Sequence, residues 1–201
     1  GISSQLAIKA IGIAFGVLCK AEMLKPGSEA STAVSASLAN LALFTKIASL
    51  KSQGQSIAEQ IKDKMVYIVG TGWSYPLAIR WKGQLNENAK QIAFAEMMPE
   101  MCHNMYLGYD LPKNIRCNSA VIFLDAPDDH EQNRKRVLLV GQDLAKVGAT
   151  VLHPELDAKL TPLARLIAMI MLGDYVSYYL ALLNEKDPAE MKRIEDLKKQ
   201  L

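Results

Sequence analysis

The sequence predicts an α/β fold, a three-layer αβα sandwich around a mainly parallel sheet, with extra helices at both ends. Four short apolar runs have the composition of buried strands, VYIVG from residue 66, QIAFAEM from 91, AVIFLDAP from 120 and ATVLHPE from 149. The runs are continuous rather than alternating, which is typical of parallel strands covered on both faces. Helical stretches separate them, and this alternation indicates a doubly wound sheet.

Apolar spacing also predicts helices before the first strand. Residues 3–24 are apolar almost all round, which predicts a buried helix that ends at the Lys25-Pro26-Gly27-Ser28 segment. Gly54 is predicted to separate the next helix from a short one that leads into the sheet. The stripe of that next helix is Val34, Leu38, Leu41, Phe44 and Ile47, and the short helix carries Ile57 and Ile61.

Further helices are predicted between and after the strands, at 75–88, around 99–107, at 130–147 and from about 158 to 184. A last helix is expected to follow Asp187-Pro188, with Asp187 as its N-cap and Pro188 at its first position. We expect one domain with a helical lead-in, a sheet core and C-terminal helices, at 1–64, 65–156 and 157–201.

Composition excludes several classes of protein. The net charge is +2, and acids and bases are interspersed, which argues against a dedicated nucleic-acid surface. The densest cationic run, at 134–136, fits a solvated helix face. The three cysteines, Cys19, Cys102 and Cys117, have no CxxC spacing, so we expect neither a zinc site nor a disulfide framework. The expected setting is a reducing cytoplasm. The sequence contains no run of about eighteen apolar residues, so we expect no membrane span.

Polar residues follow three of the predicted strands, and open α/β sheets bind ligands at that edge. The first group is Gly70-Thr71-Gly72-Trp73-Ser74. Its glycines and the helix start after it suit a sugar or phosphate cradle. A tight strand-to-helix turn explains the same residues equally well.

The second and third groups contain histidine. His103 follows a short turn near the end of the second predicted strand and is either a structural residue or a proton shuttle. In LDAPDDH, the residues Asp125, Asp128, Asp129 and His130 either ligate a metal or, as we favour, cap and start the helix at 130.

Glu87 stands between two amides, Asn86 and Asn88, with Lys90 close behind. The apolar stripe of this helix is predicted to fail from residue 80 onward, which leaves its end exposed. A glutamate there is normally solvent-facing. A carboxylate that is kept ionised and aimed at a carbon acid can instead act as a general base. Composition alone leaves both interpretations open.

The segments VYIVGTGWSYPLAIRWKGQLNENAK, PEMCHN and LGDYVSYYLALLNEKDPAEMKRIEDLKKQL resemble the second half of bifunctional phosphoglucose/phosphomannose isomerases. Those proteins consist of two sugar-isomerase (SIS) domains with a flavodoxin-like sheet. The resemblance runs from about residue 55 to the carboxyl terminus. It implies that this chain is the C-terminal SIS domain and that the N-terminal SIS half is absent from it.

The resemblance also implies a chemistry without metal or organic cofactor. The family interconverts aldose and ketose 6-phosphates through a cis-enediol. The base of the family matches Glu87, the ring-opening histidine matches His103, and a lysine near the carboxyl terminus matches Lys198. The histidine would come from the other subunit, so the resemblance implies a homodimer with shared active sites. Residues that we expect to contact the hexose 6-phosphate are Gly70, Thr71, Gly72, Ser74 and Asn86.

The sequence departs from the family pattern at three places. Met105 stands where the family usually has an acid after the His-Asn pair. Lys9 is the only cation in the region where the family has an arginine, just before or at the start of the first helix of this half. The Ser/Thr cluster that grips the sugar phosphate has no convincing copy here. A non-catalytic SIS domain that binds sugar phosphates or mediates dimerisation is therefore the alternative. A dinucleotide-binding GxGxxG motif would require a third glycine after Gly70 and Gly72, and Tyr75 occupies that position.

Overall fold

The computed structural model describes residues 29–44, 47–125 and 129–201. At its centre is a parallel sheet of four strands in the order β2-β1-β3-β4. This order confirms the predicted sheet and all four of its strands. The strands are β1 (Met65–Thr71), β2 (Ala93–Met98), β3 (Ser119–Leu124) and β4 (Thr150–Leu152).

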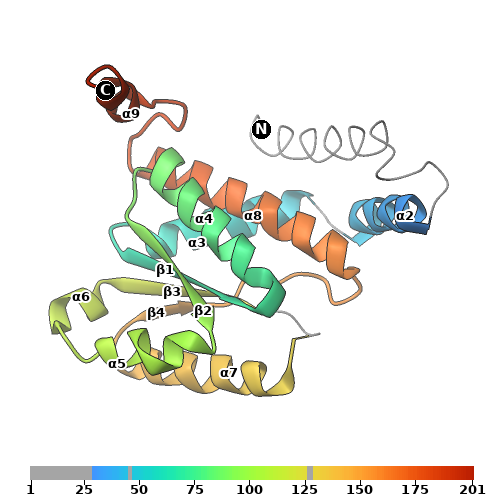
Figure 1. Cartoon of the computed structure of the whole chain (residues 1–201), viewed down its shortest axis with the longest axis horizontal. Helices are drawn as coiled ribbons and strands as arrows, with labels where there is room; N and C mark the ends of the chain where they lie inside the picture. The colour runs from blue at the N-terminus through green and yellow to red at the C-terminus, as the bar shows by residue number, and fades with distance from the viewer. Residues whose placement is uncertain (1–28, 45–46, 126–128) are drawn as a thin grey trace.

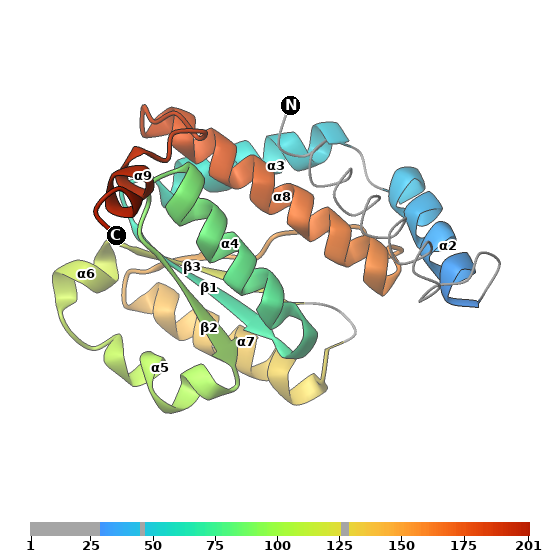
Figure 2. The same cartoon turned by 45° about the horizontal axis from the view of Figure 1, so that its top comes forward.

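Helices cover both faces of the sheet, which confirms the three-layer prediction (Figure 1). One face carries α3 (Ile47–Ile61), α4 (Tyr75–Asn88) and α8 (Pro162–Leu183), and the other carries α5 (Met105–Gly108) and α7 (Glu131–Lys146). At the two ends of α8 lie α2 and α9, as the tilted view also shows (Figure 2). The remaining elements are α2 (Glu29–Phe44), η1 (Gly72–Ser74), η2 (Glu100–His103), α6 (Lys113–Cys117) and α9 (Lys192–Lys198).

The core is divided by the sheet into two apolar clusters. The larger lies under α3, α4 and α8 and contains Trp81, Ile122 and Leu172; the smaller lies under α7 and contains Phe123 and Leu144. In the described part of the chain, α8 alone is long and apolar enough to cross a membrane, with a mean hydropathy of 1.7. Because 67% of that stretch is buried inside the fold, α8 is accounted for as a core helix.

Two predictions about the helices on the α3, α4 and α8 face of the sheet are wrong. Gly54 lies inside α3 instead of ending a helix. A Cβ at this position would lie 2.6 Å from Cβ of Tyr175, so the glycine permits a close crossing of α3 and α8. The apolar stripe of α4 does not fail after residue 80 either. Trp81 and Leu85 are both buried and continue the stripe nearly to the end of the helix.

The last helix begins later than predicted. Asp187 does not cap it, because its carboxylate accepts a hydrogen bond from the N–H of Ala189 in a turn, and α9 begins only at Lys192. A side chain of Asp that bonds two residues ahead favours a turn over a helix start. The predicted helix at 3–24 lies outside the described residues.

Candidate functional site

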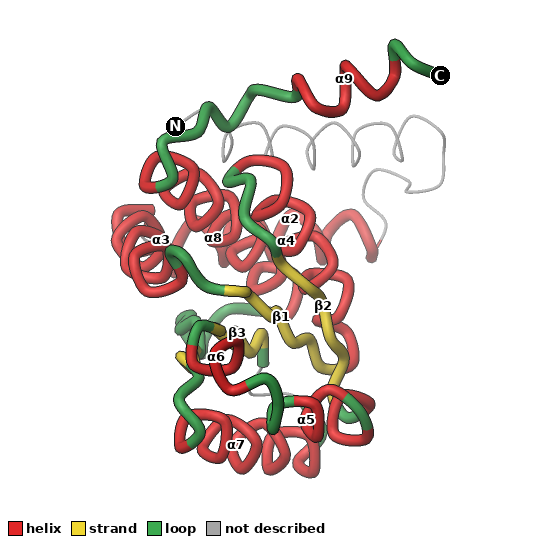
Figure 3. Tube along the Cα trace, turned by 90° about the vertical axis from the view of Figure 1, so that its left-hand side faces the viewer, coloured by secondary structure: helices red, strands yellow, loops and turns green. Residues whose placement is uncertain are grey.

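The sequence-predicted site residues lie at two opposite edges of the sheet. Helix α4 starts after the carboxyl end of β1 and runs back to the amino end of β2. There Asn86 accepts a hydrogen bond from the N–H of Ala93 (2.9 Å) and donates to its carbonyl (3.4 Å). Glu87 is therefore at the amino edge of the sheet. Figure 3 looks onto this edge and shows the ends of α4 and α8 with the C-terminal segment beyond them.

The glycine turn lies at the carboxyl edge, and the structure favours its interpretation as a tight turn. Thr71 and Ser74 are both buried. The N–H of Thr71 donates to Oγ of Ser74 (2.8 Å), and that hydroxyl donates to the carbonyl of Thr71 (2.9 Å). A Cβ on Gly70 would lie 2.4 Å from Cα of Tyr75, and Gly72 has a φ of +43°. The turn is thus closed on itself, and α4 separates it from Glu87.

His103 also lies at the carboxyl edge, at the end of η2, and is exposed. It is separated from Glu87 by the length of β2, about 20 Å for six residues. A single copy of the chain therefore does not bring the two residues together.

The LDAPDDH group serves mainly to start α7, as favoured. His130 is the N-cap, because its Nδ1 accepts from the N–H of Gln132, and Asp129 accepts from the N–H of His130. Asp128 lies outside the described residues. Asp125 is paired with His153 at 3.4 Å, a contact that sequence reasoning missed. Within the described ranges, no group of three or more His, Cys, Asp or Glu side chains could hold a metal ion.

A groove of about 570 Å³ lies beside Glu87 at the amino edge, and we call it the Glu87 groove. One wall is the end of α4 and the loop that leads into β2, and the other is the segment 186–194. Four cations line it together with the carboxylates of Glu87 and Glu190. These cations are Lys90, Lys186, Lys192 and Arg193. A role for Lys186, Lys192 and Arg193 was not predicted from the sequence. The signal that could have pointed to them is their clustering after α8.

The amides beside Glu87 hold the end of the helix, and Asn86 also lines the groove. Asn86 is bonded to β2 as described, and Asn88 donates to the hydroxyl of Ser177 in α8 (3.0 Å). The next loop is held as well, because Asn184 donates to the carbonyl of Ala89 (3.0 Å). The position of Glu87 at the edge is therefore fixed by contacts with both β2 and α8.

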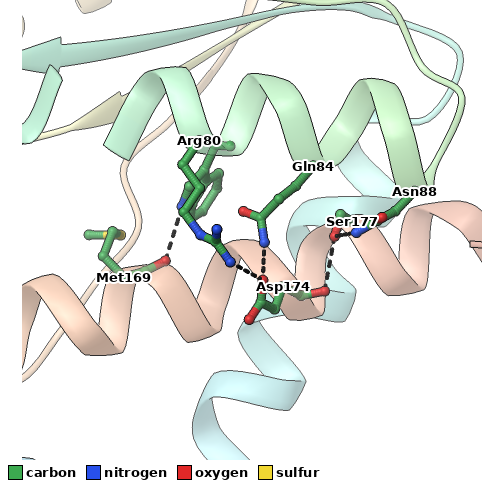
Figure 4. Close-up of polar contacts among 7 residues, drawn as sticks. Arg80, Gln84, Asn88, Met169, Asp174 and Ser177 are labelled. Carbon is green, nitrogen blue, oxygen red and sulfur yellow. Dashed lines mark hydrogen bonds and ion pairs between the residues drawn. The ribbon is translucent and has the colours of Figure 1, made fainter. Parts of the chain in front are cut away.

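Farther along the same helices, polar groups join α4 to α8 (Figure 4). Asp174 of α8 is 3% exposed and accepts hydrogen bonds from Arg80 (3.3 Å) and Gln84. Burial raises the pKa of the Asp174 carboxyl to about 6, although the Arg80 guanidinium opposes this shift. These contacts set the register between the helices and thus the distance between Glu87 and the segment after α8.

This arrangement can support proton transfer at a carbon atom. An exposed carboxylate can accept a proton from a carbon acid, and nearby cations stabilise the oxyanion that forms. Lys198 is the last residue of α9 and is exposed. It stands one helical turn after Ile194, which lines the groove, so the two side chains lie on one face of α9. The structure thus brings Lys198 to the same edge as Glu87.

Comparisons with known proteins identify the family of this chain. Residues 50–201 match the family model for the bacterial phospho-glucose isomerase C-terminal SIS domain. The chain is 34% identical over 152 residues to the bifunctional phosphoglucose/phosphomannose isomerase of Caldicellulosiruptor bescii, which covers 75% of this chain and 44% of that protein. It is 32% identical to the protein of that name from Aquifex aeolicus, over 79% of this chain and 49% of that protein. The chain thus spans about half the length of these curated relatives.

Solved structures with low sequence identity share the fold. The C-terminal domain of glucosamine-fructose-6-phosphate aminotransferase from Francisella tularensis superposes with a TM-score of 0.63 at 19% identity, over 80% of this chain and 47% of that one. A putative phosphosugar isomerase from Clostridium difficile 630 gives 0.62 at 14% identity, over 89% and 52%. With the family model matching three quarters of its length, the chain belongs to the family of bacterial phospho-glucose isomerase C-terminal SIS domains.

Proposed function

We propose that this chain is the base-carrying half of a sugar-phosphate isomerase that interconverts glucose 6-phosphate or mannose 6-phosphate with fructose 6-phosphate. The observation that carries the proposal is the Glu87 groove, in which the carboxylate of Glu87 and four cations line one groove at a helix end that is held by hydrogen bonds. The names of the relatives, all phosphoglucose/phosphomannose isomerases, support the choice of substrate.

In the proposed reaction, Glu87 removes a proton from the carbon next to the sugar carbonyl and returns it to the former carbonyl carbon, while the hydroxyl proton of the first carbon passes to the former carbonyl oxygen. The intermediate is a cis-enediol, which carries negative charge on oxygen as it forms. Cations of the groove, together with Lys198, lower the energy of this charge. Proton transfer of this kind contributes about 10²–10⁴-fold to the rate when the base is positioned.

A second copy of the chain would complete the site. Ring opening requires a proton moved between the ring oxygen and the anomeric hydroxyl, a task that suits the imidazole of His103. Because His103 and Glu87 of one chain lie at opposite edges, we assign the histidine of each site to the partner in a homodimer. The hydroxyls of Thr71 and Ser74 are buried in their turn, so we assign phosphate binding to an N-terminal SIS half, in cis or in trans.

The experiment is to assay fructose 6-phosphate conversion by the full-length protein and by its Glu87→Gln variant. We expect kcat to fall by about 10²-fold or more with the thermal unfolding temperature unchanged, because an exposed carboxylate is replaced by an amide of the same shape. Glu59→Gln, the same change at an exposed position of α3, is the matched control and should keep full activity. Retained activity in Glu87→Gln would remove Glu87 from the mechanism.

The second candidate is a non-catalytic SIS domain that binds sugar phosphates or joins subunits. It is favoured by the closed glycine turn, which leaves this chain without its own phosphate grip. If the full-length protein binds fructose 6-phosphate without converting it, the result would support the non-catalytic domain over the isomerase. For either function we propose the cytoplasm as the location, since metabolism of hexose phosphates takes place there.

A further inference from the structure

The last fifteen residues, 187–201, form an arm that carries α9 and Lys198 beyond the ends of α4 and α8 (Figures 1 and 3). Among the described residues, one hydrogen bond joins this arm to the rest of the protein. The ammonium of Lys90 donates to the carbonyl of Asp187 over 2.7 Å, across 97 positions of the sequence. The arm's attachment therefore depends on a single polar contact.

Apolar packing contributes to this attachment as well. Met191 and Ile194 line the groove opposite Ile92. They are 39% exposed each, so each buries more than half of its surface, whereas Ile92 is 63% exposed. Leu197 and Leu201, farther along the arm, are 56% and 98% exposed. Beside the packing of Met191 and Ile194, the hydrogen bond from Lys90 is thus the one polar contact in the described ranges that fixes the position of the arm.

Lys90 is itself held firmly enough to anchor the arm. It follows the carboxyl end of α4, and its ammonium is also 3.4 Å from the carbonyl of Asn88. A cation is favoured at a helix carboxyl terminus because the free carbonyls there carry partial negative charge. Asn184 donates to Ala89 and to Gln91 on the two sides of Lys90, over 3.0 and 3.1 Å.

The backbone at Lys90 belongs to a cluster of strained positions. Lys90 has a φ of +54°, Asp63 one of +59° and Glu185 one of +55°, and each follows the end of one of the helices α4, α3 and α8. All three residues line one second cavity at the amino edge, of about 410 Å³. Lys90 lines this cavity and also the Glu87 groove. Backbone strain of this kind persists where the surroundings hold it and tends to gather at functional sites.

We propose that Lys90 is a positioning residue, a latch that holds the C-terminal arm against the end of α4. Through its bond to Asp187, it sets where Lys192, Arg193 and Lys198 stand relative to Glu87. The catalytic part of this inference rests on the proposed function, whereas the latch itself does not. Loss of the latch would leave Glu87 in place and release the cations that face it.

Hydrogen–deuterium exchange of the chain as it stands tests the latch without any activity. In Lys90→Met the stem is kept and the donor is lost. We expect the amides of 190–201 to exchange about 2- to 10-fold faster, the range that corresponds to one net hydrogen bond. Lys90→Arg keeps a donor and should leave exchange near the wild-type rate. Lys51→Met removes an exposed lysine from α3 and is the control for charge.

Exchange in β1 and β3 shows that each variant is folded, and Lys90→Gln, whose amide is shorter, provides a second variant without the contact. Unchanged exchange of the arm in both Lys90→Met and Lys90→Gln would overturn the latch. In the full-length protein, we expect Lys90→Met to lower kcat by about 10-fold with KM nearly unchanged, since misplaced cations act on the transition state. Lys90→Arg should recover most of kcat.

The two proposals fail in different ways. Faster arm exchange in Lys90→Met together with an inactive wild-type protein would keep the latch and reject the isomerase. Full activity in wild type and unchanged arm exchange in the variants would keep the isomerase and reject the latch.

Discussion

The guanidinium of Arg80 lies 3.3 Å from the carboxylate of Asp174, and this pair joins the middle of α4 to the middle of α8. The two partners differ in their access to water, because the Arg80 side chain is 45% exposed and that of Asp174 is 4% exposed. One oxygen of Asp174 and one of Gln84 are buried without a hydrogen-bond partner. The fold thus supplies hydrogen-bond partners to only part of the buried Asp174 carboxylate.

The first prediction concerns the pH dependence of stability. The pKa of Asp174 in the fold is about 6, above its ordinary value of 3.8. The folded state therefore binds this proton more tightly than the unfolded state, and the stability that the group contributes is full below about pH 3.8 and is lost as the pH rises through 6. Asp174→Asn removes the titration. Urea unfolding of both proteins between pH 4 and 8 should show wild type losing stability relative to the variant up to about pH 6, with no further change above 7.

Parallel stability curves for wild type and Asp174→Asn would contradict that prediction. Arg80→Met provides a second check, because loss of the nearby cation should raise the pKa of Asp174 further and move the transition to higher pH.

The second prediction compares two glycines of the helices that form this face. A Cβ on Gly173 of α8 would lie 2.4 Å from Nε1 of Trp81, whose indole donates to the carbonyl of Met169 over 3.0 Å. We expect Gly173→Ala to lower the free energy of unfolding by about 1–3 kcal/mol, because the buried indole must shift. Gly83→Ala in α4 meets no atom within 4 Å and should raise it by about 0.5–1 kcal/mol. Denaturant unfolding measures both, and equal effects would contradict the helix contact.

The third prediction tests the anchor of the helix end. Asn86 makes two hydrogen bonds to the backbone of Ala93, so Asn86→Ala should lower the free energy of unfolding by about 1–3 kcal/mol. Asn86→Asp keeps the acceptor for the N–H of Ala93 and should lose less. Asn114→Ala at an exposed position of α6 is the control and should change stability by less than about 0.5 kcal/mol. If Asn86→Ala behaves like this control, the anchor is not formed in solution.

The fourth prediction tests whether Glu87 and His103 meet across a dimer. Full-length Glu87→Gln and His103→Ala should each be inactive alone. When the two are unfolded together and refolded, half of the dimers are mixed, and each mixed dimer contains one site with both native residues, so about a quarter of wild-type activity should return. A mixture as inactive as its components would show that both residues act within one chain.

Much of the fold follows from the order of residues along the chain. The four strands and the helix at Tyr75–Asn88 were predicted because periodicity and caps depend on near neighbours in sequence. Predictions failed where a contact distant in sequence decides the structure. Gly54 lies inside α3 at the point where Tyr175 of α8 packs closely against it. No local sequence pattern predicts this crossing of α3 and α8. The start of α9 was misplaced because the side chain of Asp187 closes a turn instead of a helix cap.

By itself, the sequence determined the α/β class and the family, and it predicted Glu87, His103 and Lys198 as the residues that carry chemistry because they stand in recognisable local motifs. Only the tertiary structure decided which of these residues share an edge of the sheet. Because α4 and α8 both run back toward the amino ends of the strands, Glu87 meets the cations of the C-terminal segment there, whereas His103 remains at the opposite edge. The contact between Lys90 and Asp187 that holds the C-terminal segment at this edge joins positions 97 apart in the sequence, and the spacing of residues along the chain does not contain such a contact.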